Sequence, residues 1–265
     1  MKTFIFLKLG GSLITDKDRE NTIRKEVIQR LAAEIAEARA ANPDLGMLIG
    51  HGSGSFGHNA AHQHSTRAGV GSPRAWQGFA EVWFRARLLN QIVIESLREV
   101  GLPVIAFPPS AFFLACDGKA LPPPISPLQA ALEAGLIPVV NGDTVFDTAR
   151  GGTILSTEDI FSALVPSLSP ARILLAGIEH GVYADYPTCL HLIPYVTPFS
   201  SNIIRSQIQG SASIDVTGGM RSKVDEMLSL AQQYPGFEAL IFSGMVPGNL
   251  REALKGFCPG TRIHA

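Results

Sequence analysis

The chain has 265 residues, of which 46% are hydrophobic and 17% are charged, a balance typical of a folded globular protein and unlike that of a disordered chain. Its formal net charge of -1 excludes a global positive field that would attract nucleic acid or an anionic membrane. No apolar stretch reaches the roughly 18 residues of a membrane span, and the start lacks the apolar run of a signal peptide. Three widely spaced cysteines form no zinc-type pair, so we predict reduced thiols and a cytoplasmic location.

Short apolar runs alternate with longer segments of helical periodicity. In chain order, strands are expected at 4–7, 46–49, 103–106, 137–140, 173–175 and 239–242, and helices at 25–41, 80–100, 128–134 and 223–233. This alternation predicts a three-layer α/β/α sandwich around a central, mainly parallel sheet. Prolines and serines cluster at 166–170, where we expect a junction between two lobes.

Glycine-rich and polar residues follow several predicted strands. They occupy 8–12, 50–58 and 141–143, and a late segment, 215–220, precedes a helix that carries Lys223. Ligands of α/β sheets bind at the carboxyl ends of strands, and glycine loops that lead into helices can present backbone N–H groups to anions. Lys8, Lys17 and Lys223 would supply the positive charge that phosphoryl transfer requires. The pattern therefore predicts phosphoryl transfer.

Other nucleotide-binding motifs were weighed against this interpretation. Gly52, Gly54 and Gly57 fit the spacing of a dinucleotide fingerprint. Its acidic partner should end a second strand, whereas Glu81, at the right distance, falls in a predicted helix. The Walker A loop and the protein kinase motifs are both absent from the sequence. A kinase with this sequence must therefore use another fold.

Three histidines, His58, His62 and His64, lie close together in the sequence. A metal site would need a third ligand and a second shell, so we favour an interpretation in which His58 faces an acceptor phosphate. Asp143 follows a strand and a glycine and is interpreted as functional. Several aromatic residues are interpreted as core residues, some of which could line an apolar acceptor pocket: Trp76, Phe79, Phe112 and Phe113.

Together these residues resemble the amino acid kinase superfamily over nearly the whole chain. The most specific segments are HGSGSFGH at 51–58, PSAF at 109–112, GDTVFD at 142–147 and DVTGGM at 215–220. The glycine loop that ends in a histidine is similar to that of the branch whose members phosphorylate isopentenyl phosphate or fosfomycin. It separates this branch from the amino acid, carbamate and uridylate kinases.

The resemblance implies a role for individual residues. Lys8, Gly10, Gly11 and Ser12 would meet the ATP phosphates, and Gly219 and Lys223 would reach the nucleotide from the second lobe. Lys8, Lys17 and His58 would be the catalytic residues, with His58 bound to the acceptor phosphate. The acceptor would contact Ser53, Gly54, Gly142, Asp143 and Thr157, and Gly54 would also contact the nucleotide. No protein ligand to a metal is expected, because Mg²⁺ would bridge the ATP phosphates.

Two segments depart from the pattern of the family. Ser156-Thr157-Glu158 stands where Ser-Gly-Asp is frequent, which predicts a bulkier acceptor wall with a carboxylate further out. Ile178 replaces an aspartate expected near the nucleotide, so the nucleotide preference is left open.

The resemblance further implies an acceptor-binding lobe at 1–167, a nucleotide-binding lobe at 168–265 and a homodimer. The implied activity is ATP-dependent phosphorylation of isopentenyl phosphate to isopentenyl diphosphate by direct in-line transfer. Two alternatives stay open at this point. One is a kinase of the same fold that acts on fosfomycin or on another phosphonate or alkyl phosphate. The other is a non-catalytic nucleotide sensor, which the retention of all three lysines disfavours.

Overall fold

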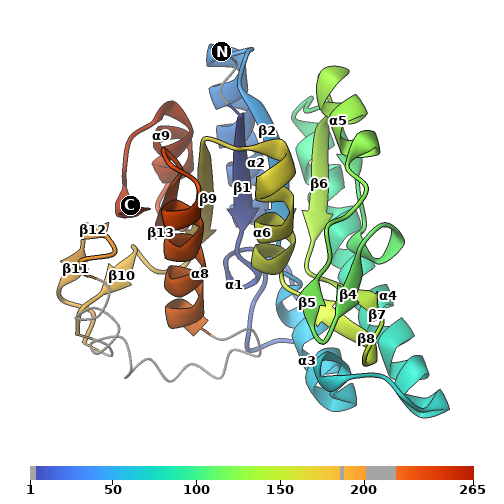
Figure 1. Cartoon of the computed structure of the whole chain (residues 1–265). Helices are drawn as coiled ribbons and strands as arrows, with labels where there is room; N and C mark the ends of the chain where they lie inside the picture. Colours follow the sequence, from blue (N-terminus) through green and yellow to red (C-terminus); the bar gives the residue numbers. More distant parts are fainter. Residues whose placement is uncertain (1–3, 186–187, 201–218) are drawn as a thin grey trace.

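The computed structural model describes residues 4–185, 188–200 and 219–265. Its main sheet has eight strands in the order β12-β14-β13-β9-β1-β2-β6-β3, and the strand pairs are parallel except β13 with β14 (Figure 1). The strands are β1 (Phe4–Leu9), β2 (Gly46–His51), β3 (Val104–Ala106), β6 (Ile137–Asn141), β9 (Arg172–Gly177), β12 (Tyr195–Val196), β13 (Glu238–Ser243) and β14 (Gly260–His264). The predicted mainly parallel sheet is thus confirmed.

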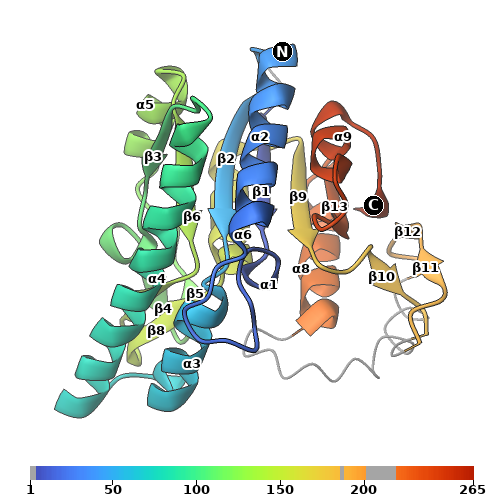
Figure 2. The same ribbon diagram turned by 180° about the vertical axis from the view of Figure 1, so that it is seen from behind.

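Helices cover both faces of this sheet, as Figures 1 and 2 show from opposite sides. One face packs against α2 (Lys25–Ala41), α4 (Pro73–Glu99) and α9 (Asn249–Lys255), and the other against α5 (Ser126–Glu133), α6 (Thr157–Leu168) and α8 (Gly219–Gln233). Successive side chains of β1 serve the two cores alternately: Ile5 and Leu7 pack with the first set of helices and Phe6 with the second. Burial on both faces explains why these strands are continuous apolar runs.

A second sheet of four strands lies at the carboxyl-end side of the first (Figure 1). Its order is β5-β4-β7-β8, formed by β5 (Lys119–Ala120), β4 (Leu114–Cys116), β7 (Asp143–Asp147) and β8 (Gly151–Leu155). Asp147 accepts hydrogen bonds from four backbone N–H groups, those of Asp117, Gly118, Ala149 and Arg150, at 2.7–3.1 Å. The second aspartate of the 142–147 segment therefore shapes two turns of this sheet.

The smaller elements complete the described chain. They are the helices α1 (Gly11–Ile14) and α3 (Gly54–His64), the 3₁₀ turns η1 (Thr66–Ala68) and η2 (Pro109–Ala111), and a hairpin of β10 (Val182–Tyr183) and β11 (Leu192–Ile193). The short second sheet and the hairpin were not predicted, because strands of two to five residues give too few repeats for a period-two pattern.

Helices α4, α6 and α8 differ from the sequence-based expectation, and α8 begins at Gly219 rather than at residue 223. Helix α4 begins at Pro73 rather than near residue 80, because the Ser72 hydroxyl caps the helix by accepting from Ala75 N and Pro73 suits the first turn. Helix α6 was missed, and it runs through Pro166 into the predicted lobe junction. Its start has a capping box of Ser156 and Asp159. The predicted boundary at 167/168 thus falls in the last turn of α6, and the main sheet continues across it through the pairing of β1 with β9.

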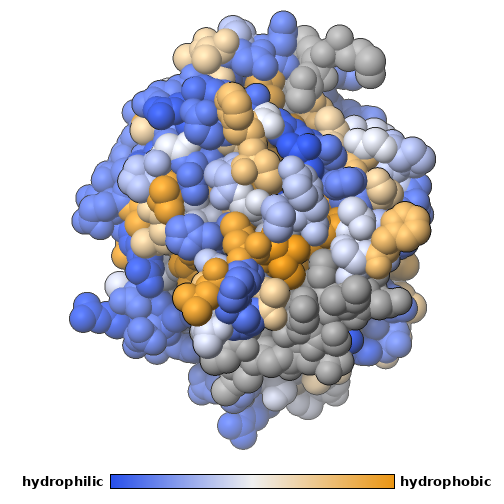
Figure 3. Space-filling view, turned by 90° about the vertical axis from the view of Figure 1, so that its left-hand side faces the viewer, coloured by the Kyte–Doolittle hydropathy of each residue, from blue (hydrophilic) through white to orange (hydrophobic). Residues whose placement is uncertain are grey.

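Figure 3 views the molecule from the side of the hairpin and β12, where hydrophobic patches are interspersed with hydrophilic residues. Leu190, Tyr195 and Phe199 are exposed apolar side chains of this region. Within the described ranges, none of the helices is long and apolar enough to cross a bilayer.

Candidate active site

A pocket with a cavity volume of about 460 Å³ opens at the carboxyl ends of the central strands. The loops after β1, β2, β6 and β9 meet there, since Gly10 N donates to Ala176 O, Gly52 N to Leu9 O and Gly142 N to His51 O, at 2.8–3.1 Å. All but one of the predicted site residues line this pocket: Lys8, Gly10, Gly11, Ser12, Lys17, Ser53, Gly54, His58, Gly142, Thr157, Gly219 and Lys223. The exception is Asp143.

Two glycine loops touch backbone to backbone in the floor of the pocket. A Cβ atom on Gly11 would lie 2.6 Å from Gly54 N, and one on Gly52 would lie 2.8 Å from Gly11 N. Gly54 also has a positive φ of 49°, a conformation that glycine adopts without steric cost. Only glycines allow the loops to approach this closely. The backbone of both loops therefore lies at the pocket, at the starts of α1 and α3, as binding of phosphate oxygens requires.

His58 projects from the first turns of α3 and lines the pocket. Its Nδ1 lies 3.0 Å from the carbonyl oxygen of Gly54, so this ring nitrogen carries the proton and donates. The contact ties the orientation of the imidazole to the glycine loop. An imidazole held in this way can bind an anionic group in the pocket.

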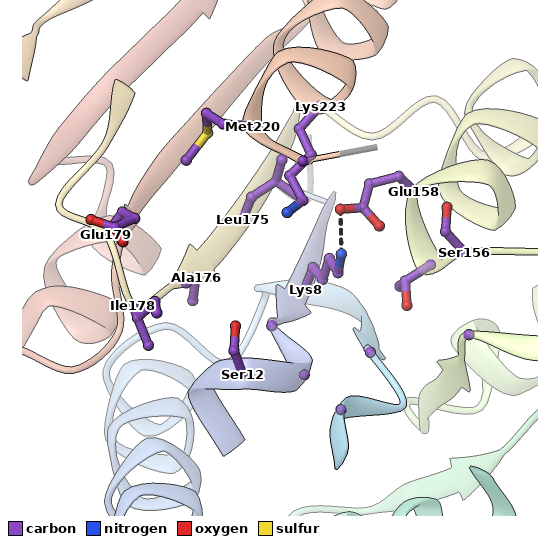
Figure 4. A pocket seen from close by; sticks show the side chains of 18 of the residues that line it. Lys8, Ser12, Ser156, Glu158, Leu175, Ala176, Ile178, Glu179, Met220 and Lys223 are labelled. Atoms are coloured by element: carbon purple, nitrogen blue, oxygen red, sulfur yellow. Dashed lines mark ion pairs between the residues drawn. The ribbon is translucent and has the colours of Figure 1, made fainter. Parts of the chain in front are cut away.

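A buried ion pair joins the two sides of the pocket. Lys8, at the end of β1, pairs with Glu158 in the first turn of α6, and Lys223 from α8 points toward the same carboxylate (Figure 4). Burial by itself would raise the pKa of Glu158, but attraction to Lys8 and then Lys223 more than offsets it, and the pKa lies below its usual range. Glu158 is therefore ionised and holds two lysines beside one another. Sequence reasoning treated Glu158 only as a departure from the family pattern and missed this role.

Thr157 and Asp143, both predicted to contact the acceptor, have different surroundings from those expected. Thr157 lines the pocket but is only 1% exposed, and its hydroxyl donates to the backbone oxygen of His51 at 2.8 Å. Asp143 is buried and accepts from Ser110 N at 3.1 Å and Thr144 N at 2.9 Å. Burial raises the pKa of Asp143 to about 6. Its geometry is that of a residue that joins the 109–112 and 142–147 segments, not one that faces the pocket.

The aromatic residues considered for an acceptor pocket lie elsewhere. Phe113 is buried in the core, and Trp76 packs against Phe79 and Phe146 outside the pocket. The apolar residues that line the pocket include Ile154 and Leu155 of β8, and Ile154 packs against Ala60 and Ala61 of α3, the helix that carries His58. The second sheet, which was not predicted, thus supplies this apolar wall.

The opposite end of the pocket is formed by the segment after β9. Ile178, Glu179 and Tyr183 line it together with Met220 of α8, and Figure 4 shows Ile178 and Glu179 on the far side of Ser12 from Glu158. Residues 215–218 of the DVTGGM segment lie outside the described residues, whereas Gly219 begins α8 with a φ of 69°.

Comparison with known proteins identifies the class. The model of the amino acid kinase family matches residues 3–243, and the chain belongs to this family.

Among full-length relatives, the isopentenyl phosphate kinase of Methanothermobacter thermautotrophicus is 34% identical, with 98% of each chain covered. That of Methanocaldococcus jannaschii is 32% identical, with 97% of each chain covered. A crystal structure of an isopentenyl phosphate kinase superposes with a TM-score of 0.84 at 32% identity, covering 98% of this chain and 99% of that one.

Proposed function

We propose that this protein transfers the γ-phosphoryl group of ATP to isopentenyl phosphate, forming isopentenyl diphosphate and ADP. The observation that carries the proposal is the arrangement of the pocket. Lys8, Lys17, Lys223 and His58 line it, and so does the apolar residue Ile154, which packs against α3, the helix that carries His58. A small acceptor with an anionic head and an apolar tail matches this combination of charged and apolar groups. The similarity to relatives named isopentenyl phosphate kinase supports the same acceptor.

The reaction is a direct in-line displacement. An oxygen of the acceptor phosphate attacks the γ-phosphorus, the bond from that phosphorus to the bridging oxygen of ADP breaks, and the charge remains on phosphate oxygens throughout. Such a transfer depends on positioning and electrostatic stabilisation, so no covalent enzyme intermediate is needed. His58 would hold the acceptor phosphate, the glycine loops would hold the donor phosphates, and Lys8 and Lys17 would stabilise the transferred group.

The described lining residues suit a nucleotide that brings its own Mg²⁺. They are mainly lysines, hydroxyls and backbone N–H groups, which bind phosphate oxygens. The carboxylates among them are Glu158, which is paired with Lys8, and Glu179. We therefore propose that Mg²⁺ would enter bound to the phosphate oxygens of ATP and would keep several of its waters, which this ion gives up reluctantly. When bound, Mg²⁺ would neutralise charge on the β- and γ-phosphates.

The test is ADP release by the purified protein with Mg-ATP and, in parallel, isopentenyl phosphate, dimethylallyl phosphate and fosfomycin. We expect turnover with the isoprenoid phosphates and little with fosfomycin. Preference for fosfomycin would keep the transfer chemistry and replace the acceptor. ATP binding without turnover on any of the three would contradict the proposal and support the nucleotide-sensor alternative.

We also propose that the protein is a homodimer that uses the outer side of α4. Trp83, Phe84 and Leu88 are each more than one third exposed, and Trp76 and Phe146 continue this apolar surface. Exposed aromatic residues on one side of a helix are typical of interfaces between subunits.

The lobe that carries α4 would bind the acceptor, and the lobe that carries α8 would bind the nucleotide.

A further inference from the structure

A second polar contact lies behind the lysine–carboxylate cluster of the pocket. Ser162 is four residues after Glu158 on α6, and Glu226 is three residues after Lys223 on α8. These spacings place each residue on the same helix face as its predecessor, one turn further from the pocket. The Ser162 hydroxyl donates to Glu226 Oε1. At the pocket, Lys223 of α8 attracts Glu158 of α6, and one turn away the hydrogen bond from Ser162 to Glu226 joins the same two helices.

The surroundings of Glu226 are costly for a carboxyl group. Burial between the helices is the main cause that raises the pKa of Glu226, to about 7. The hydrogen bond from Ser162 lowers this pKa, the neighbouring carboxylates Asp159 and Glu158 raise it, and attraction to Lys8 lowers it. Asp159 is itself engaged in capping α6 and lies 3.7 Å from Arg67. An apolar residue at this position would avoid the desolvation penalty. A gain in stability therefore does not explain the polar contact. Because the contact runs from α6 to α8, it fixes the position of one helix relative to the other.

We propose that the Ser162–Glu226 contact is a positioning latch that holds α8 against α6, so that Lys223 stays beside Glu158 and faces the phosphates of the bound nucleotide. The inference rests on the proposed function, since it takes Lys223 to contact the nucleotide of that reaction. Two hydrophobic helix faces can slide or rotate past one another at little cost, whereas a hydrogen bond has a fixed partner and direction. Because α8 begins at the pocket with Gly219, a shift of α8 carries Lys223 directly with it. Ser162 and Glu226 do not line the pocket and act only through Lys223.

The latch predicts a defined pattern of kinetic changes. Ser162→Ala and Glu226→Leu should each lower kcat by about 10-fold or more, because misplacement of a catalytic group by about 1 Å can cost up to 100-fold. The KM for isopentenyl phosphate should change less than about 2-fold, since His58 and the apolar wall are not attached to α8. Glu226→Gln keeps an oxygen that accepts from Ser162, and it should restore most of kcat. The kcat of the double variant Ser162→Ala/Glu226→Leu should be no lower than that of the slower single variant, because the two substitutions remove the same contact.

Matched controls are available on the same helices. Ser167→Ala on α6 and Ser229→Ala on α8 remove exposed hydroxyl groups and should leave kcat unchanged. The affinity for a non-hydrolysable ATP analogue, measured by calorimetry, gives a second readout that needs no acceptor. This affinity should weaken about 3- to 10-fold in Ser162→Ala and Glu226→Leu but not in Glu226→Gln, because the displaced Lys223 would lose its charge-assisted contact with the phosphates of the analogue.

The outcomes separate the latch from the proposed function. Wild-type turnover, measured first, tests the function by itself, and the ratio of variant to wild type tests the latch. If Ser162→Ala and Glu226→Leu melt at lower temperature but keep wild-type kcat and analogue affinity, the contact is only structural and the latch is wrong. If Glu226→Leu fails to fold, Ser162→Ala, which removes a single oxygen, still decides the question. If the wild type turns over none of the acceptors, unchanged analogue affinity in Ser162→Ala would refute the latch.

Discussion

At the scale of single residues, the pocket combines groups that can be removed without damage to the fold and groups that cannot. His58 is partly exposed and its hydrogen bond goes to the backbone of its own helix. Lys8 is 9% exposed and neutralises a buried carboxylate. Both are assigned to the proposed reaction, but only Lys8 is also part of the packing. Substitutions at the two sites should therefore differ in their effect on stability.

His58→Ala should lower kcat by about 10²–10³, the scale for removal of one preorganised donor, with little change in Tm. Lys8→Ala should lower kcat by a similar factor and also lower the free energy of unfolding by about 3–5 kcal/mol, because Glu158 loses its partner. Thermal unfolding and steady-state kinetics measure both. In Lys8→Ala/Glu158→Gln, Tm should recover while kcat does not. Equal Tm values for Lys8→Ala and wild type would contradict the structural role of the pair.

The close approach of the glycine loops leads to a second prediction. A methyl group on Gly54 would overlap the hydroxyl of Thr15, and its φ of 49° is unfavourable for alanine. We expect Gly54→Ala to reduce kcat/KM by at least about 10²-fold, because it moves loop N–H groups away from the phosphates. Gly71→Ala is the matched control, since a Cβ there would meet no atom within 4 Å. Wild-type activity in Gly54→Ala would show that the floor of the pocket adapts to a side chain.

At the scale of elements, α4 serves two environments. Leu89, Val93 and Leu97 are buried against the main sheet, while Trp83, Phe84 and Leu88 face away from it. A helix of 27 residues with apolar groups on both sides is more apolar than burial in a single chain requires. The outer side is the proposed surface of the dimer.

Replacing Trp83 and Phe84 with lysine should convert the proposed homodimer into a monomer, because buried positive charges would face one another across a symmetric interface. Sedimentation velocity measures the change. Phe199→Lys, on an exposed residue of a different surface, should leave the dimer intact. A monomeric wild-type protein would refute this interface.

At the scale of the whole molecule, titration of buried carboxyl groups should make stability depend on pH. The pKa of Glu226 rises from 4.5 to about 7 on folding because of burial and neighbouring carboxylates. Between these values the folded state keeps a proton that the unfolded state has lost. The folded state therefore binds more protons, and the free energy of unfolding contributed by this group falls as pH rises through that window.

Glu226→Gln removes this contribution, so its Tm relative to wild type should increase from about pH 5 to about pH 8. Differential scanning calorimetry at both pH values measures the difference. Asp143, whose pKa is also raised, to about 6, contributes with the same sign in both proteins and cancels in the comparison. A Tm difference that does not vary with pH would mean that Glu226 is ionised at all these pH values.

Much of the central sheet and of the pocket floor could be predicted from the sequence. The strands of the main sheet that flank the pocket are fully buried runs, and the glycines and lysines that follow them are adjacent in sequence to those runs. Because carboxyl ends of parallel strands lie at one edge, Lys8, Gly11, Gly54 and Gly142 had to come together once the strands were recognised. The amino acid kinase fold, which was predicted from these segments, is confirmed by the family match and by the superposition on a solved relative.

The functions of Glu158, Asp143 and Glu226 could not be read in the same way. Each depends on a partner far along the chain: Lys8 lies 150 residues from Glu158, Ser110 lies 33 from Asp143, and Ser162 lies 64 from Glu226. Local periodicity and motif spacing hold no information about such pairs.

The sequence by itself determined which segments form the centre of the main sheet and which loops line the pocket, because these follow from local hydrophobic patterns and from glycines beside strand ends; it did not reveal β12 and β14 at one edge. Only the tertiary structure decided which carboxylates face the lysines, which aspartate turns away from the pocket, and which strands build the apolar wall. The physical reason is that burial, charge pairing and helix register are set by contacts between distant segments, and these contacts exist only in the folded chain.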